Sequence, residues 1–139
     1  MSRRTVFDMV NEAKAEIEEL SVDELAAEIE AGTCTVIDIR DFRERLNLGA
    51  IPGAVSAPRG MLEFWFDPES PYYRENSYQF DERYVFYCAG GMRSALAAKA
   101  VKDLGYGDVA HLEPGFAGWK DAGRDIEDVP EHAKWVKRD

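Results

Sequence analysis

The chain has 139 residues, 45% of them hydrophobic and 12% aromatic, which is enough apolar material for the core of one domain. Its 27 acidic side chains outnumber its 17 basic ones and give a net charge of -10, which excludes nucleic acid and anionic membranes as expected partners. Acidic residues follow Arg3 and Arg4 so closely that neither a signal peptide nor a membrane span is expected, and we expect a cytoplasmic protein.

The N-terminal residues predict two helices in succession. Apolar side chains recur at helical spacing from Val6 to Leu20 and predict the first helix. Ser21 and Glu24 have the spacing of a capping box, which opens the second helix, and Gly32 suits its end. We expect the first helix to form an extension over residues 1–19, ahead of the main domain.

Strands and helices then alternate along the chain. Thr33 to Ile39 is β-branched and apolar, and Tyr84 to Tyr87 is a second strand candidate that runs into a glycine-bearing loop and the helix Ser94 to Leu104. A short strand, Val109 to Leu112, and a short helix, Phe116 to Ala122, follow. This alternation predicts an α/β layered fold with a mainly parallel sheet.

The remaining segments do not indicate a second domain. Trp65 to Phe80 is aromatic but rich in turn residues, which is typical of a long loop. We expect one domain over residues 20–124 and a C-terminal tail over residues 125–139 that packs on the domain or trails it.

The two cysteines, Cys34 and Cys88, are far apart in the sequence, which is neither a disulfide framework nor a metal-binding spacing. His111 and His132 stand alone, so each is expected to be an ordinary surface or core histidine. Neither a metal nor a cofactor is therefore expected. Cys34 lies inside a predicted strand, where a small core residue is the simplest interpretation.

Cys88 has a different setting, because it follows a predicted strand and precedes a helix. Ligands of open α/β sheets bind at the carboxyl ends of the strands. The helix dipole, free backbone amides and Arg93 would all favour a thiolate there. Gly90 and Gly91 permit the backbone to turn successive amides inward, so the loop can cradle an anion.

These residues resemble the rhodanese family, whose members carry a catalytic cysteine in a short loop between a central strand and a helix. The loop reads Cys88-Ala89-Gly90-Gly91-Met92-Arg93-Ser94. Two more segments are similar to the family's signatures, Asp38 to Arg40 with Ile51 to Ala54, and Glu113 to Trp119. The resemblance covers roughly Leu20 to Gly123. Ala50 departs from it, because the family commonly has a histidine before the Ile-Pro-Gly-Ala turn.

The resemblance implies a three-layer fold with a mainly parallel five-stranded sheet and helices on both faces. It also implies a sulfurtransferase in which Cys88 takes sulfur from thiosulfate or a similar small donor as a persulfide and passes it to a thiol or cyanide, with a protein as a further possible acceptor. Residues 89–94 would bind the anion, namely Ala89, Gly90, Gly91, Met92, Arg93 and Ser94. Asp38 and Arg40 would brace the loop, and Arg59 and Trp65 would lie at the rim of the pocket.

Two other functions stay open. Protein tyrosine and dual-specificity phosphatases also combine a cysteine, an anion loop and an arginine. Only four residues separate Cys88 from Arg93, however, whereas the phosphatase pattern has five, and the larger ring is the one that accommodates phosphate. The second alternative is a regulatory module of the same fold without catalysis, with the loop from Trp65 to Phe80 as its partner surface.

Overall fold

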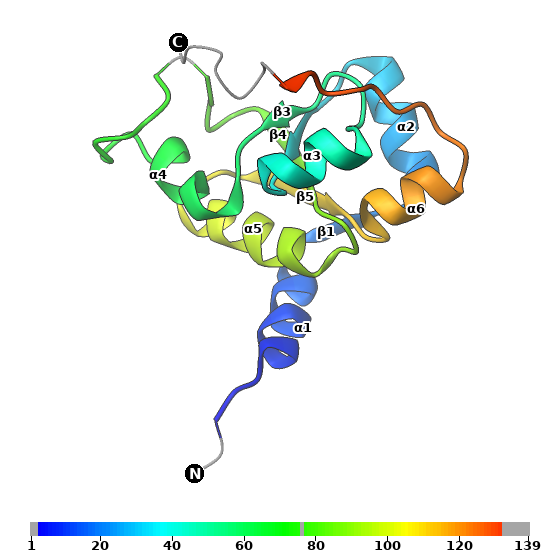
Figure 1. Cartoon of the computed structure of the whole chain (residues 1–139). Coiled ribbons are helices and arrows are strands. Elements are labelled where there is room, and N and C mark those ends of the chain that lie inside the picture. Colours follow the sequence, from blue (N-terminus) through cyan, green and yellow to red (C-terminus); the bar gives the residue numbers. More distant parts are fainter. Residues whose placement is uncertain (1–2, 76, 132–139) are drawn as a thin grey trace.

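Five strands pair side by side, all parallel, in the order β1-β5-β4-β2-β3 within the part of the chain that the structure describes. That part of the computed structural model comprises residues 3–75 and 77–131 (Figure 1). The strands are β1 (Glu18–Leu20), β2 (Thr35–Asp38), β3 (Val55–Ser56), β4 (Arg83–Tyr87) and β5 (Asp108–Leu112). The central position therefore belongs to β4, the strand that leads into Cys88.

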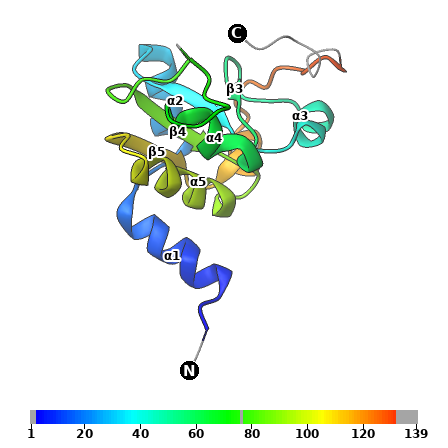
Figure 2. The same ribbon diagram turned by 90° about the vertical axis from the view of Figure 1, so that its left-hand side faces the viewer.

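Helices cover both faces of this sheet (Figures 1 and 2). They are α1 (Val6–Glu16), α2 (Val22–Ala31), α3 (Phe42–Leu48), α4 (Leu62–Phe66), α5 (Met92–Asp103) and α6 (Gly115–Asp121), with a short 3-10 turn at Arg59–Met61. α4 and α5 bury apolar side chains such as Phe66 and Ala98 against one face. α2 and α6 bury Leu25 and Trp119 against the other. This three-layer arrangement confirms the predicted fold class.

Local sequence signals account for several of these elements. The Ser21 hydroxyl accepts from the Glu24 amide and the Glu24 carboxylate accepts from the Ser21 amide, so the predicted capping box opens α2. Gly32 ends α2 in the left-handed region at φ 69°. β2 and β4 are almost entirely buried, as expected of strands covered on both faces.

The first helix is shorter than predicted. α1 ends at Glu16, and Glu18–Leu20 forms β1, which pairs with β5 through Glu18 and Ala110. The helical spacing of the apolar residues continues to Leu20, but pairing with a strand ninety residues away imposes an extended backbone on residues 18–20. Figure 2 shows that α1 stands out from the body, on the side of α5. It is attached there by contacts of Val10 and Ala13 with Ala95.

The predicted boundaries at residues 19 and 124 stay predictions. Beyond Asp121, the backbone of Glu127 exchanges two hydrogen bonds of 2.9 Å with Ala50. Residues 132–139, which include His132 and half of the predicted tail, lie outside the described residues. None of the helices in the described ranges is long and apolar enough to cross a bilayer.

Candidate active site

Cys88 lies at the carboxyl end of the central strand, and its side chain is buried. Its Sγ accepts hydrogen bonds from the backbone amides of Gly91 at 3.1 Å and Ser94 at 3.4 Å. Both amides belong to the turn into α5, whose positive end faces the sulfur. Two of the amides in the loop from Ala89 to Ser94 thus converge on one atom, which favours a negative charge there.

Two carbonyl groups at the start of the loop are held by α6. The amides of Phe116 and Ala117 donate to the carbonyls of Cys88 and Ala89, at 2.8 and 3.0 Å. This close approach requires Gly115, since a Cβ there would lie 2.5 Å from the Ala89 oxygen. Gly91 is required as well: its φ is 96°, and a Cβ would overlap the Glu113 carbonyl. The segment Glu113 to Trp119 therefore shapes the loop around the sulfur.

A hollow of about 370 Å³ lies over Cys88. Its walls are mostly apolar and come from the loop, from Met92 and Leu96 of α5, and from Val6 and Val10 of α1. The N-terminal helix is thus part of the site, a contribution that the sequence did not indicate.

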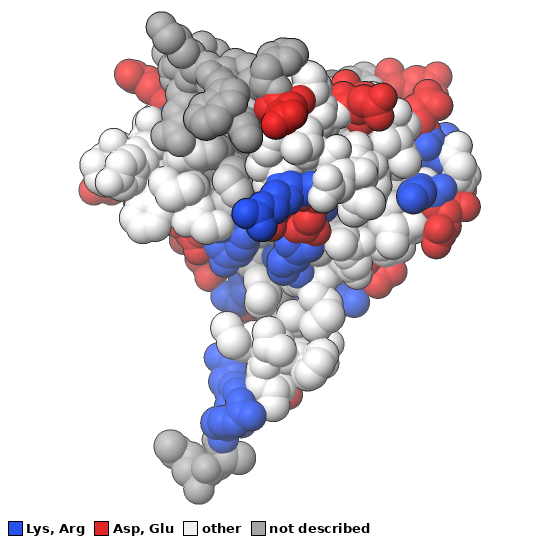
Figure 3. Space-filling model, viewed as in Figure 1, with Lys and Arg blue, Asp and Glu red and all other residues white. Residues whose placement is uncertain are grey.

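Arg93 lies at the edge of this hollow, but its guanidinium is engaged with Glu44 of α3. Two parallel hydrogen bonds of 2.8 and 2.9 Å join the pair. The Arg93 interaction lowers the pKa of Glu44, so the carboxylate is charged at neutral pH. In Figure 3 basic and acidic side chains are interspersed over α3 and α5 in the middle of this face. The arginine charge at the mouth is therefore largely neutralised in this conformation.

Arg59 and Trp65 do not line the hollow over Cys88. Trp65 is buried in the same apolar cluster as Cys88, and the Arg74 guanidinium stacks on its ring at 3.9 Å. Arg59 pairs with Glu63 at 2.6 Å and lines a neighbouring hollow that shares Leu96. Trp65 therefore packs on the same side of the sheet as Cys88, and a contact of Arg59 or Trp65 with donor or acceptor stays a prediction.

Asp38 and Arg40 form a buried network next to the site. Arg40 Nε and Nη2 donate to the two Asp38 oxygens at 3.0 and 2.8 Å, and Arg40 Nη2 also donates to the Gly49 carbonyl at 2.8 Å. Arg45 and the Tyr87 hydroxyl donate to Asp38 Oδ2 at 2.8 and 2.7 Å. Burial raises the pKa of Tyr87, so it remains a donor. The network ties α3 and the turn after it to the strand that carries Cys88.

Comparison with known proteins agrees with this geometry. Residues 21–122 match the family model of the rhodanese-like domain. The chain belongs to the rhodanese-like family. Helix α1, which forms one wall of the hollow, lies outside the matched residues.

Individual relatives carry different descriptions. A solved structure from Rhodopseudomonas palustris, described as a protein of unknown function and possible tyrosine phosphatase, is 47% identical, with 91% of this chain and 97% of that chain covered and a TM-score of 0.85. The thiosulfate sulfurtransferase GlpE of Shewanella oneidensis is 30% identical over 74% of this chain and 92% of its own length. The candidate sulfur carrier YrkF of Bacillus subtilis is 26% identical over 78% of this chain, which spans only 54% of YrkF.

In this rhodanese-like chain, Ala50 replaces the histidine that we expected in the family pattern. The turn that follows is fixed by other groups. The Tyr87 hydroxyl accepts from the Ile51 amide at 3.1 Å, and the Glu127 carboxylate accepts from the Gly53 amide at 2.9 Å. Together with the backbone pair of Ala50 and Glu127, these contacts hold the turn without a histidine.

His111 belongs to a buried hydrogen-bonded chain that the sequence did not reveal. Ser94 Oγ lies 3.5 Å from Cys88 Sγ and 2.8 Å from His111 Nδ1, and His111 Nε2 lies 2.9 Å from Glu19 Oε2. Glu44 and Glu19 were missed for the same reason: each reaches the site from an element distant in sequence. The only signal for His111 in the sequence was its place in the predicted strand Val109 to Leu112.

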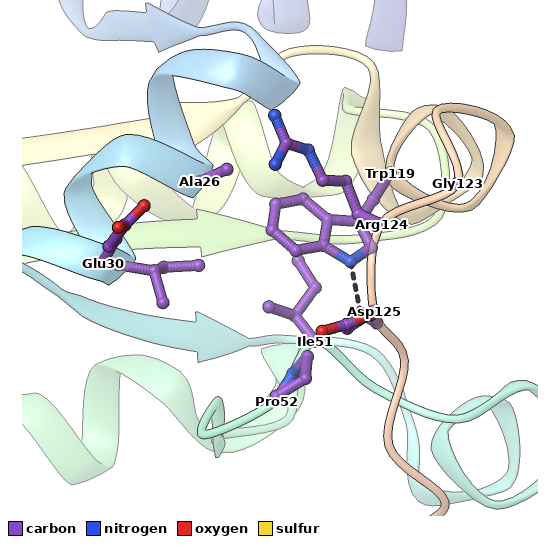
Figure 4. Close-up of a pocket in the computed structure, with 9 residues that line it drawn as sticks. Ala26, Glu30, Ile51, Pro52, Trp119, Gly123, Arg124 and Asp125 are labelled. Atoms are coloured by element: carbon purple, nitrogen blue, oxygen red, sulfur yellow. Dashed lines mark hydrogen bonds between the residues drawn. The ribbon is translucent and has the colours of Figure 1, made fainter.

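A second hollow, of about 340 Å³, lies between α2, the turn at Ile51 and the end of α6 (Figure 4). Trp119, from the second signature, forms part of its wall and donates its ring N-H to the Asp125 carbonyl at 2.8 Å. The indole is otherwise buried, in agreement with a packing role. This hollow does not reach Cys88.

The other cysteine, Cys34, has none of these features. Burial, reinforced by the charge of Glu28, raises its pKa to about 11, so Cys34 is a thiol at neutral pH. Within residues 3–75 and 77–131, no three His, Cys, Asp or Glu side chains are grouped closely enough to hold a metal ion.

Proposed function

We propose that the protein is a sulfurtransferase that moves a sulfane sulfur from thiosulfate or a similar donor to a thiol or cyanide acceptor through a Cys88 persulfide. The observation that carries the proposal is the setting of Cys88 Sγ, which accepts from the Gly91 and Ser94 amides beneath an apolar hollow in a rhodanese-like domain. Such a setting stabilises a sulfur anion.

In the first half of the reaction, the Cys88 thiolate attacks the outer sulfur of the donor. A bond forms between Sγ and that sulfur while the bond from it to the sulfonate group breaks, and sulfite leaves with the electron pair. In the second half, the acceptor thiolate or cyanide attacks the outer sulfur, and Cys88 leaves as a thiolate. Donated amide hydrogen bonds stabilise the charge on sulfur at both stages.

The apolar walls of the hollow would surround both the persulfide and the acceptor that approaches it. Val6, Val10, Met92 and Leu96 surround the entrance with apolar surface, which would exclude water from a reactive persulfide. A relative described as a candidate sulfur carrier supports transfer to or from another protein as part of this proposal.

The proposal is tested by thiocyanate formation from thiosulfate and cyanide. The wild-type chain is expected to turn over, Cys88→Ser is expected to lose activity, and Cys34→Ser, the matched control, is expected to retain it. If both variants lose thiocyanate formation equally while circular dichroism shows that both are folded, Cys88 is not the specific nucleophile. A folded wild type without any sulfur transfer would favour the non-catalytic module.

A second candidate is a tyrosine phosphatase, which the description of the Rhodopseudomonas palustris structure favours. The loop has four residues between its cysteine and arginine, and Arg93 is paired with Glu44 in place of facing the sulfur. Both features suit a single sulfur atom better than a phosphoryl group. Hydrolysis of p-nitrophenyl phosphate that depends on Cys88, without thiocyanate formation, would select the phosphatase instead.

A further inference from the structure

The tautomer of His111 follows from its two partners. Hydrogen bonding to His111 and Lys14 outweighs partial burial and lowers the pKa of Glu19, so this residue is an ionised acceptor at neutral pH. His111 Nε2, 2.9 Å from Glu19 Oε2, must then carry the proton of that hydrogen bond. Nδ1 then carries no proton, so it accepts a hydrogen bond of 2.8 Å from the Ser94 hydroxyl.

This arrangement orients Ser94 toward Cys88. Because the Ser94 hydroxyl proton points at His111, the lone pairs of Ser94 Oγ face Cys88 Sγ, 3.5 Å away. Ser94 Oγ therefore accepts a hydrogen bond from the Cys88 thiol. A continuous path therefore leads from the sulfur through one hydroxyl to a buried imidazole. All three of these residues are buried, so water does not compete along the path.

We propose that His111 takes up the Cys88 proton through Ser94, so that the nucleophilic thiolate forms together with an imidazolium that Glu19 stabilises. The proton leaves Sγ for Ser94 Oγ as the Ser94 proton passes to His111 Nδ1, and no bond between heavy atoms changes. The inference rests on the proposed role of Cys88 as the nucleophile. His111 is then a positioning residue that acts through Ser94.

Charged groups from three elements surround the imidazole. Glu19 comes from β1, Lys14 from α1, and Glu113 follows β5; Lys14 Nζ lies 3.3 Å from Glu19 and 3.6 Å from Glu113. Burial lowers the pKa of His111, so the ring is neutral at rest, and burial by itself disfavours the imidazolium. The two carboxylates favour the imidazolium once it forms, and Lys14 opposes it.

The test is the rate at which iodoacetamide, a neutral reagent, alkylates Cys88 as a function of pH, because this rate follows the thiolate fraction. In His111→Asn the side chain can still bond Ser94 but cannot hold the proton. Glu19→Gln keeps a hydrogen-bonding group while removing the charge, and its partly exposed site is expected to tolerate the change. Glu18→Gln, on the same strand but paired with Arg83 at 3.0 Å, is the matched control.

The midpoint of the pH profile is expected to move up by about one unit in His111→Asn, which slows alkylation about tenfold at neutral pH. Glu19→Gln is expected to move it in the same direction by less, and Glu18→Gln not at all. Unchanged midpoints in His111→Asn and Glu19→Gln would overturn the relay; if His111→Asn does not fold, an unchanged Glu19→Gln profile alone would do so. Alkylation needs no sulfur donor, so it tests the relay alone. The sulfurtransferase proposal is tested separately by thiocyanate formation.

Discussion

The two cysteines differ in what surrounds their sulfur atoms. Cys88 accepts two backbone hydrogen bonds, whereas burial and then the charge of Glu28 raise the pKa of Cys34 to about 11. In Cys88→Ser, Cys34 is the sole cysteine of the sequence. This variant is expected to take up almost no iodoacetamide near neutral pH and to label only as the pH approaches 11, measured by intact mass. Rapid labelling at neutral pH would contradict the assigned surroundings of Cys34.

The pair of Arg93 and Glu44 sets how much positive charge the mouth of the site offers to a donor. Glu44→Gln is expected to free the guanidinium and lower the KM for thiosulfate by up to about fivefold, since an exposed ion pair is worth about 0.2–1 kcal/mol. Arg93→Ala is the control of opposite sign and is expected to raise KM with little effect on stability. Steady-state kinetics check both, and identical KM values in all three proteins would place the donor elsewhere.

At the scale of elements, the turn after α3 depends on the Tyr87 hydroxyl. This group accepts from the Ile51 amide and donates to Asp38, both in the buried interior. Tyr87→Phe is expected to lower the free energy of unfolding by about 1–3 kcal/mol, because it leaves the Ile51 amide without its acceptor and removes one of the buried hydrogen bonds to Asp38. Urea denaturation measures the loss. Tyr72→Phe, at an exposed tyrosine, is the control and should change stability by less than about 0.5 kcal/mol; equal losses would contradict the network.

Helix α1 supplies a wall of the hollow through Val6, whose neighbour Phe7 is exposed and does not line it. Val6→Asp is expected to raise the KM for thiosulfate about two- to fivefold by placing a carboxylate at the mouth. Phe7→Asp adds the same charge to the same helical turn, so it controls for net charge and for the helix dipole. Equal KM values in the two variants would show that α1 does not border the donor's path.

Elements whose signals are local were predictable from the sequence. The capping box of Ser21 and Glu24, the β-branched run in β2 and the loop after β4 each act within a few residues. β1 and α3 were not predicted, because Glu18–Leu20 becomes a strand only through β5, and α3 is a short helix with a buried Arg45 held by Asp38. The same limit applies to the candidate site: the placement of Cys88 at the end of a strand was predictable, while His111 and Val6 come near it only after the chain folds.

For the whole molecule, the rhodanese-like domain and the added helix combine into one site. The net charge of -10 opposes anionic ligands, and at the mouth Arg93 is offset by Glu44. The proposed sulfur anion would therefore be stabilised by the buried amides and the polar chain behind Cys88 more than by surface charge.

The most direct test of the sulfurtransferase proposal is the intact mass of the whole chain after incubation with thiosulfate and removal of the excess. The account predicts a gain of one sulfur atom in the wild type, located on Cys88 by peptide mapping, retained in Cys34→Ser and reversed by cyanide. An unchanged mass in the folded wild type, or a sulfur located on Cys34, would contradict it.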